Sequence, residues 1–281
     1  LTLTGTNTQS RSYISGGVLS VNQDRAFGAV PGSTDSNNIT INGGTLKTTA
    51  SFTINTKRGI QLDASNSTIN VDASTTLTYA GIIVHQGSET NNGYTKSGGG
   101  TFALSGDSTY SGVTTISAGV ITIAHAGSLG STSGATSITS GAALSISGGI
   151  TVAEPITVNG TGVSSGGAIV FTANDNTYSG AITLGSTSTI VSTGGAQTIS
   201  ATVNGGQALT ITANGNLVIS GAVGGSTDLS SYAVTTTGSA SQTFSANVET
   251  TGNQTYTAAG GIVTSGARTF DSSSGTVNFA S

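Results

Sequence analysis

The sequence from Thr101 to Ile123 reads Thr-Phe-Ala-Leu-Ser-Gly-Asp-Ser-Thr-Tyr-Ser-Gly-Val-Thr-Thr-Ile-Ser-Ala-Gly-Val-Ile-Thr-Ile, and it decides the fold. Apolar and small polar side chains alternate near both ends, and glycine-containing turns separate the short runs. Alternation with period two places apolar side chains on one face of a strand and hydroxyls on the other. Glycine adopts positive φ at little cost, so the chain can turn sharply between runs. This stretch therefore predicts short β-strands joined by tight turns.

The same pattern recurs along the whole chain, with almost no helical periodicity. Asp107–Gly112 returns as Asp175–Gly180, and Ile14–Leu19 resembles Ile41–Leu46, so one unit repeats with unequal spacing. Repetition of this kind is typical of a solenoid whose loops differ in length. Alternating runs occur at Leu1–Thr4, Ile39–Asn42, Phe52–Asn55, Thr68–Val71, Ile121–Ile123, Leu144–Ser147, Leu209–Thr212 and Leu217–Ser220.

The composition favours a parallel β-solenoid over a β-sandwich. The 281 residues include only 6% charged and 5% aromatic residues, whereas a sandwich usually has a thick core with aromatic residues and protects its edges with charge. Stacked coils repeat at about 4.8 Å, so equivalent side chains form ladders. Like charges in a ladder repel, whereas Thr, Ser and Asn can hydrogen-bond along the stack. At roughly 20–25 residues per coil, we expect about 11–14 coils and an elongated rod of about 55–65 Å.

The composition also excludes several classes of protein. There is no Cys, so neither disulfides nor thiolate metal sites are possible. Seven basic residues and a net charge of −4 cannot form the basic surface that nucleic acid requires. We find no signal peptide and no apolar stretch long enough for a membrane helix, so no direct membrane insertion is expected. The absence of Met, with Leu1 as the first residue, predicts a processed piece of a longer, exported bacterial surface protein.

Residues 96–123, followed by Gly127-Ser-Leu-Gly130, closely resemble the autotransporter-associated β-strand repeat of bacterial surface proteins. Residues 248–256 and 275–281 resemble the repeats of large exoproteins similar to filamentous haemagglutinin. The resemblance implies a right-handed parallel β-helix, secretion to the outer face of a Gram-negative cell, and a stalk or adhesin passenger. The same family is resembled by the upstream segments Asn38–Leu46, Phe52–Ile54, Arg58–Ile60, Thr68–Val71 and Leu77–Ile82, and the match is weaker outside residues 35–130.

We predict one continuous β-solenoid over residues 1–281. Residues 1–164 would hold the autotransporter-type β-strand repeats, and residues 165–281 the looser coils that resemble filamentous haemagglutinin. Neither end of the chain has a capping element: Leu1–Thr4 starts as a strand and Thr276–Phe279 finishes as one. Because exposed sheet edges recruit further strands, we expect either more coils in a longer precursor or identical subunits that stack end to end as a homopolymer.

Charged residues could in principle form a catalytic or metal site, but their spacing favours structural roles. His85 and His125 are far apart and have no second ligand beside them, so we interpret both as surface or loop imidazoles. Asp63 and Asp72 are less than half a coil apart, which places them on different sides rather than as a glycosidase pair. The Lys57–Arg58 dipeptide with Asp63 is also compatible with the basic–acidic cluster of a polysaccharide lyase. A solvated corner is the preferred reading, and the resemblance places Arg58 in a structural stretch.

The aspartates and glycine turns lack the patterns of calcium and phosphate sites. Asp24, Asp35, Asp107 and Asp175 lack the nonapeptide pattern of calcium-binding repeats, so capping of turns is the preferred reading. Gly160-Thr-Gly162 is followed by Ser165 where a dinucleotide-binding motif needs glycine, and no helix is expected after it. The glycines at 98–100 are interpreted as a turn.

Repeated tyrosines and threonines suggest two further surfaces. Tyr110, Tyr178 and Tyr256 recur in similar contexts and could form an aromatic platform for sugars. We prefer a structural role in which each ring covers the interior and its hydroxyl reaches water. Ice binding would need a flat face of stacked threonines, but no common period is seen among the pairs Thr2/Thr4, Thr210/Thr212 and Thr255/Thr257.

The sequence therefore predicts a non-enzymatic, secreted structural or adhesive rod of a bacterial surface protein or extracellular filament, as in a biofilm. We assign no catalytic residue, no metal site and no cofactor. Expected partners are neighbouring coils of a longer precursor, identical subunits, or host and cell-surface glycans, with no nucleic acid. Its location would be extracellular, on the outer cell surface. The alternatives are a carbohydrate-active β-helix enzyme, which would need acidic, basic and aromatic residues clustered on one strand face, and a glycan-binding module.

Overall fold

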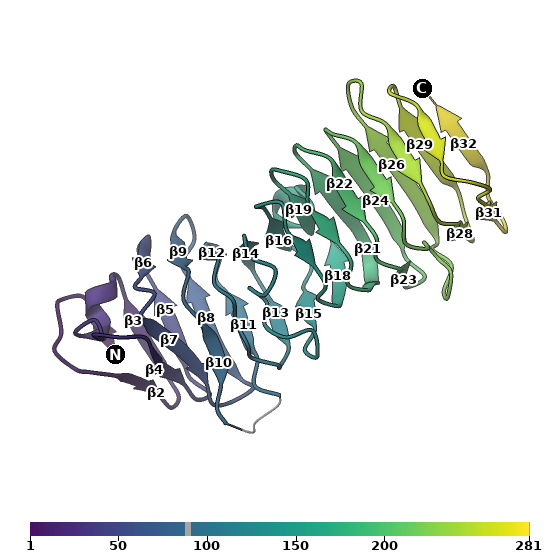
Figure 1. Ribbon diagram of the computed structural model, residues 1–281. Helices are drawn as coiled ribbons and strands as arrows, with labels where there is room; N and C mark the ends of the chain where they lie inside the picture. The colour runs from purple at the N-terminus through teal and green to yellow at the C-terminus, as the bar shows by residue number, and fades with distance from the viewer. Residues whose placement is uncertain (88–90, 281) are drawn as a thin grey trace. The chain divides into compact units, whose positions relative to one another are not determined.

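The computed structural model describes residues 1–87 and 91–280 of the chain, and short β-strands dominate this part (Figure 1). Its helices are two short 3-10 segments, η1 (Asp24–Phe27) and η2 (Val163–Ser165). The strands stack in parallel as coils of β-solenoid, about 12 turns in all, which confirms the predicted all-β, parallel β-helical fold. Across these residues, no helix has the length and apolar character needed to cross a bilayer.

The chain forms two compact units, residues 1–137 and 138–281, and β15 (Thr136–Ile138) lies where they meet in sequence. The predicted single solenoid over 1–281 and the change of repeat type at residue 164 stay predictions. Unit 1 contains the strands β1 (Thr2–Leu3), β2 (Ser12–Ile14), β3 (Val18–Val21), β4 (Asp35–Ile41), β5 (Thr45–Thr48), β6 (Phe52–Ile54), β7 (Arg58–Leu62), β8 (Ser67–Val71), β9 (Thr76–Tyr79), β10 (Ile83–His85), β11 (Tyr94–Ser97), β12 (Thr101–Leu104), β13 (Thr114–Ile116) and β14 (Gly119–Ile123).

Unit 1 has three ladders of parallel strands, so a typical coil contributes one strand to each. One ladder runs β2–β4–β7–β10, the second β1–β3–β5–β8–β11–β13, and the third β6–β9–β12–β14. Successive partners lie 19 residues apart from Thr101 to Val120 and 27 apart from Thr68 to Thr95. The predicted repeat of 20–25 residues falls within this range.

Unit 2 is built in the same way. Its ladders run β16–β19–β21–β24–β26–β29–β32, β17–β20–β22–β25–β27–β30, and β18–β21–β23 with β28–β31. The strands of this unit are β16 (Ala142–Ile146), β17 (Thr151–Val152), β18 (Ile156–Gly160), β19 (Ile169–Phe171), β20 (Thr177–Tyr178), β21 (Ile182–Ser192), β22 (Gln197–Ile199), β23 (Val203–Asn204), β24 (Ala208–Ala213), β25 (Leu217–Ile219), β26 (Ser231–Thr236), β27 (Gln242–Phe244), β28 (Val248–Thr250), β29 (Gln254–Ala258), β30 (Ile262–Thr264), β31 (Phe270–Ser272) and β32 (Val277–Ala280).

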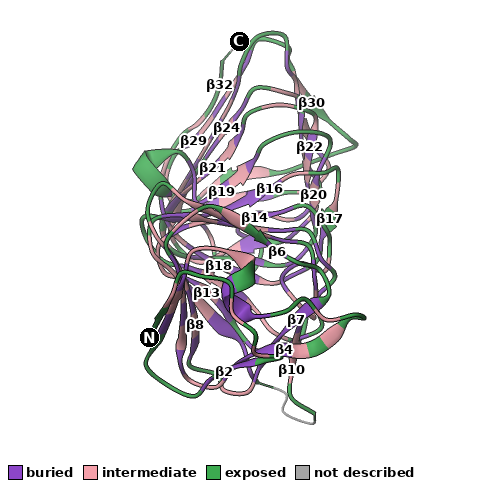
Figure 2. Ribbon diagram, turned by 90° about the vertical axis from the view of Figure 1, so that its left-hand side faces the viewer, coloured by how far each residue is buried: buried purple, intermediate pink, exposed green. Residues whose placement is uncertain are grey.

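The core of each unit consists of ladders of inward side chains, and the loops carry most of the exposed residues (Figure 2). One such ladder in unit 2 starts at Leu144, continues through isoleucines and a valine, and ends with the stacked rings of Tyr256 and Phe279. Alternation within each strand explains this core, because every second side chain points inward.

Threonines on the outer surface of unit 2 also form ladders, so two of the three threonine pairs, Thr210/Thr212 and Thr255/Thr257, lie in register. In unit 2, pairing across β24, β26 and β29 aligns two ranks, Thr210–Ala233–Thr255 and Thr212–Thr235–Thr257. Unequal loops between the strands hide this alignment in the sequence. Ala233 interrupts the first rank, and in unit 1 Thr2 lies in β1 whereas Thr4 lies outside a strand.

Candidate functional site

Arg58 is the centre of a buried polar cluster in unit 1. The side chain is fully buried at the start of β7, and its Nε donates to Asp24 Oδ1 at 2.9 Å. Its Nη1 donates to Asn38 Oδ1 at 2.9 Å, and its Nη2 donates to the carbonyl of Gly28 at 2.7 Å. Asp24 lies at the start of η1, so the guanidinium ties the loop around η1 to the strands β4 and β7. An arginine that meets several acceptors in a fixed fork is suited to holding backbone segments together.

This cluster corrects the interpretation of Lys57–Arg58 and Asp63 as a solvated corner. Lys57 is exposed and donates to the carbonyl of Gly32, but Arg58 faces the interior. Asp63 accepts a hydrogen bond from the Gln61 side chain at 2.6 Å, and Asp72 pairs with Lys47 at 3.1 Å. Asp63 and Asp72 therefore each have their own partner and do not form a pair. The buried hydrogen bonds of Arg58 agree with the structural role that the resemblance implies.

Lys96 is a second buried charge that the sequence interpretation did not identify. In the ladder of β5, β8, β11 and β13 it occupies the position that Leu46, Ile69 and Ile116 occupy in the other coils. Its Nζ donates to the carbonyl of Gly98 at 2.8 Å and to that of Ala118 at 2.9 Å. Burial lowers the pKa of this ammonium to about 8. The lysine thus joins the glycine turn of one coil to the next coil.

We expect Lys96→Met to destabilise unit 1 by about 1–2 kcal/mol at pH 7. Methionine fits the aliphatic ladder, but two partly buried carbonyls lose their donor, at a cost near the lower end of roughly 1–3 kcal/mol each. Relief from burying an ammonium offsets part of this cost. Urea unfolding followed by tyrosine fluorescence measures the change. The matched control is Lys47→Met, which removes a half-exposed ion pair and should cost less than about 1 kcal/mol. Equal effects of the two substitutions would contradict the assigned role of Lys96.

Glu154 is a third buried charge, located between β17 and β18 of unit 2. It is 3% exposed, and neither carboxylate oxygen has a hydrogen-bond partner among the described residues. Burial raises the pKa of this carboxyl to about 7. Tyr178 donates its hydroxyl to the backbone carbonyl of Glu154 at 2.8 Å, so the two residues lie side by side. A lone buried carboxyl of this kind can bind a proton near neutral pH.

The three repeated tyrosines are structural, but their hydroxyls do not reach water as predicted. Tyr110, Tyr178 and Tyr256 are fully buried, which leaves no ring face for a sugar. The hydroxyl of Tyr110 shares a hydrogen bond with Thr114 Oγ1, and that of Tyr256 donates to Gln254 Oε1 at 2.7 Å. Buried phenol groups need such protein acceptors once water is excluded.

The aspartates considered for calcium lie apart, and three of them bind neighbouring protein groups. Asp24 pairs with Arg58, Asp35 pairs with Arg11, and Asp175 accepts the backbone N–H of Ala196 in the next coil. Asp107 is exposed and lies 3.8 Å from Nδ1 of His125. Within residues 1–87 and 91–280, no three His, Asp or Glu side chains come together as metal ligands. Turn capping thus describes Asp175, whereas Asp24 and Asp35 form ion pairs.

The two histidines and the two glycine turns do not form a binding site. His125 is exposed and its Nδ1 accepts the N–H of Gly127, whereas His85 is half-buried at the end of β10, in register with Leu62. The stretch from Gly160 to Ser165 ends in the short η2 and leads into β19, so it offers no helix for a phosphate. Gly98 adopts φ +74° in the predicted turn.

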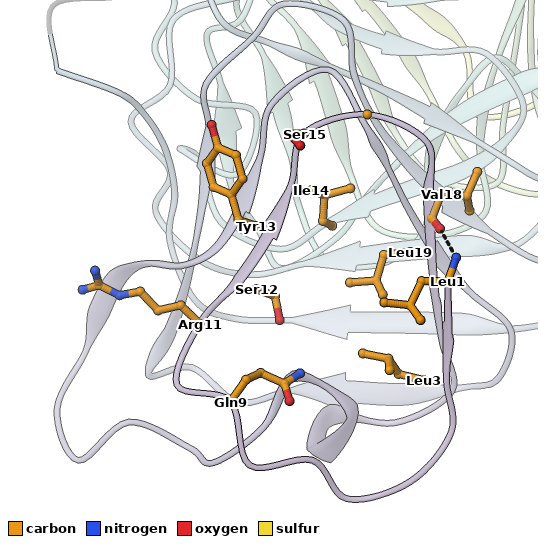
Figure 3. Close-up of a pocket in the computed structure, with 11 residues that line it drawn as sticks. Leu1, Leu3, Gln9, Arg11, Ser12, Tyr13, Ile14, Ser15, Val18 and Leu19 are labelled. Atoms are coloured by element: carbon orange, nitrogen blue, oxygen red, sulfur yellow. Dashed lines mark hydrogen bonds between the residues drawn. The ribbon is translucent and has the colours of Figure 1, made fainter.

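A hollow of about 290 Å³ lies beside the first strands of unit 1 (Figure 3). Leu1, Leu3 and Leu19 form its apolar wall, and Arg11 and Tyr13 line its polar side. In Figure 3, the side chains of Arg11 and Tyr13 point away from the leucine cluster. A second hollow, of about 430 Å³, is lined by Arg11, Asp35 and residues 29–31 with Ser10.

Comparisons with known proteins agree with this geometry. Residues 95–123 match the passenger-associated-transport-repeat family. The matched residues form β11–β14, including Lys96 and the turn at Gly119, where φ is +67° and a Cβ would lie 2.4 Å from the carbonyl oxygen of Gly100. Only glycine fits such a position without strain.

A longer relative is also similar to the chain. The adhesin BmaC autotransporter of Brucella suis biovar 1 (strain 1330) is 37% identical over 134 residues, which are 47% of this chain and 4% of that protein. The chain thus spans only a small part of this relative. No solved structure matches the chain. The two matches confirm the resemblance to autotransporter passenger repeats. Neither names a filamentous haemagglutinin, so that part of the resemblance stays a prediction.

Proposed function

We propose that this chain is a segment of an autotransporter passenger that acts outside a Gram-negative cell as a non-enzymatic, adhesive and structural solenoid. The observation that carries the proposal is the repeat at residues 95–123, which matches the passenger-associated-transport-repeat family and lies within stacked parallel coils. The similarity to an autotransporter adhesin supports the same assignment.

The mechanism we propose is mechanical. Parallel strands hydrogen-bond from coil to coil, and buried clamps such as Arg58 and Lys96 tie turns to strands. Continuous ladders of this kind resist local opening, because each coil is held by its neighbours on both sides. The surface is poor in charge and rich in hydroxyls, so it can approach other surfaces with little desolvation of ions.

The arrangement of acidic residues favours a non-enzymatic role over a carbohydrate-active enzyme. Glycoside hydrolysis needs two carboxyl groups that face each other across the bond. Asp24, Asp35 and Asp72 are each held by a basic side chain, and Glu154 is buried. Incubation of the purified chain with a panel of polysaccharides should release no reducing sugar; release that is abolished by substitution of any of these acids would overturn the proposal.

The proposed location is tested with antibodies raised against the purified chain. We expect the antibodies to label intact cells of the bacterium that encodes it, and deletion of the gene to reduce attachment of those cells to host cells or to one another. Labelling that appears only after permeabilisation would contradict the surface location. Unchanged attachment of the deletion strain would contradict the adhesive role.

We propose that the partners of the terminal strands are further coils of the same polypeptide. The similar adhesin is far longer than the matched segment, and the coils of this chain pair in parallel with their neighbours. Further coils would pair in the same way. The intact mass of the native molecule, measured on cell-surface extracts with the same antibodies, should exceed that of the 281-residue chain several-fold. A native mass equal to that of this chain, with end-to-end filaments in electron micrographs, would instead favour a homopolymer.

A further inference from the structure

Tyr13 differs from every other tyrosine of the chain in its exposure. The sequence contains seven tyrosines, and six of them are at most 1% exposed, whereas Tyr13 is 61% exposed. It lies at the middle of β2, between the inward residues Ser12 and Ile14. Its ring therefore projects from the outer face of the ladder formed by β2, β4, β7 and β10. An aromatic ring on a surface of this kind is available for stacking.

Polar side chains lie on both sides of the Tyr13 ring, one just before β2 in sequence and one just after the end of the neighbouring strand β4. Asn42, just after β4, donates its side-chain N–H to the Tyr13 hydroxyl at 2.7 Å and so fixes the ring. Arg11, two residues before Tyr13, forms a two-pronged ion pair with Asp35, with distances of 3.0 and 3.1 Å. The hydrogen bonds from Arg11 hold the pKa of Asp35 below its usual value, so the pair stays charged. We call Arg11, Tyr13, Asp35 and Asn42 the Tyr13 platform.

The Tyr13 platform borders the two hollows described above. Arg11 lines both of them, so the ion pair presents charged donors and acceptors to the larger hollow while the ring stands beside the smaller one. The larger hollow, of about 430 Å³, is open to solvent, so a ligand there would lie on the surface rather than in an enclosed pocket.

We propose that the Tyr13 platform binds a neutral hexopyranose unit of a glycan. The C–H face of a pyranose ring stacks on the exposed Tyr13 ring, because its weakly positive hydrogens meet the negative face of the aromatic system. Arg11 donates to one hydroxyl of a neighbouring pair while Asp35 accepts from the other. The inference rests on the proposed adhesive function and deepens it, since it names the class of molecule that the chain contacts.

The charges on the platform favour a neutral sugar over an acidic one, and binding over cleavage. Asp35 neutralises Arg11, so a carboxylate or sulfate on the sugar gains little from the arginine and is repelled by the aspartate. A single acidic side chain held by arginine lacks the second carboxyl group that hydrolysis requires. Few contacts and an open surface predict affinities in the millimolar range, which repeated chains on a cell surface would raise through multivalency.

Saturation-transfer NMR with the 281-residue chain tests this proposal. The neutral probes are cellotriose, mannotriose and lactose, and the acidic probes are trigalacturonate and sialyllactose. We expect transfer to at least one neutral probe and at least a tenfold loss of affinity in both Tyr13→Ala and Arg11→Gln. Tyr13→Phe should keep most of the binding, since the ring remains. The matched control is Val113→Ala, which trims another exposed apolar side chain, 50% exposed, in unit 1.

Three outcomes would overturn the proposal: no transfer to any neutral probe, binding that Tyr13→Ala leaves unchanged, or binding of acidic probes alone. Circular dichroism of each variant should match the parent chain, because all the substituted side chains lie on the surface. The antibody labelling and the attachment assay do not depend on these results. If no sugar bound while surface labelling and attachment were intact, the Tyr13 platform would not be a sugar site, but the proposed function would still hold.

Discussion

Replacement of Arg58 by methionine should lower the free energy of unfolding of unit 1 by about 3–5 kcal/mol. The guanidinium is fully buried and bonds to Asp24, Asn38 and the carbonyl of Gly28. When one partner of a buried ion pair is removed, the other charge stays in a poorly solvated place, and losses of this size result. Methionine roughly fills the space of the aliphatic part of the arginine side chain. The expected loss therefore arises mainly because Asp24, Asn38 and the carbonyl of Gly28 lose their hydrogen-bond donor.

Hydrogen–deuterium exchange, combined with urea unfolding, would measure and locate this loss. We expect faster exchange for the amides of η1 and of β7, and for Tyr79, whose hydroxyl donates to the Arg58 carbonyl at 2.7 Å. The control Arg11→Met breaks an ion pair whose arginine is 59% exposed, and it should cost less than about 1 kcal/mol. If Arg58→Met and Arg11→Met gave the same loss, or if exchange were unchanged around η1, the clamp role of Arg58 would be wrong.

The three buried charges could have been found from the alternation that predicted the fold. Arg58 has the same parity as Ile60 and Leu62 in its strand, so the rule of period two already points it inward. Lys96 shares the parity of Tyr94 in the same way, and Glu154 falls between Val152 and Ile156 at the inward positions. A charged residue that shares the inward parity of its apolar neighbours therefore signals a buried charge.

The partners of Arg58 and Lys96 could not be predicted, because they depend on loops of unequal length. Asp24 reaches Arg58 from a 3-10 turn in an earlier coil, and no period in the sequence relates the two positions. Unequal loops also concealed the threonine ranks at Thr210 and Thr255, which lie in register two coils apart. The strand pattern thus predicts which side chains face inward, whereas the loops decide which of them meet.

Glu154 should make the stability of unit 2 depend on pH between about 4.5 and 7. Burial raises the pKa of its carboxyl to about 7, above the usual value of 4.5. In this interval the folded chain therefore holds a proton that the unfolded chain has released. The contribution to stability is complete below pH 4.5 and disappears as the pH rises through about 7. Tyr178 stays neutral throughout, because burial and the nearby Glu154 raise the pKa of its phenol well above the usual value.

Glu154→Gln should remove this dependence, since glutamine is neutral at every pH and has nearly the same shape. The free energy of unfolding of the parent chain, relative to the variant, should fall by about 3 kcal/mol between pH 4.5 and pH 8. Urea unfolding at several pH values measures it, with hydrogen exchange to assign the change to β17, β18 and β20. The matched control Glu249→Gln removes a carboxylate that is only partly buried on β28, and its pH profile should follow that of the parent chain. A difference between the parent chain and Glu154→Gln that stayed constant with pH would show that Glu154 keeps its ordinary acidity in the fold.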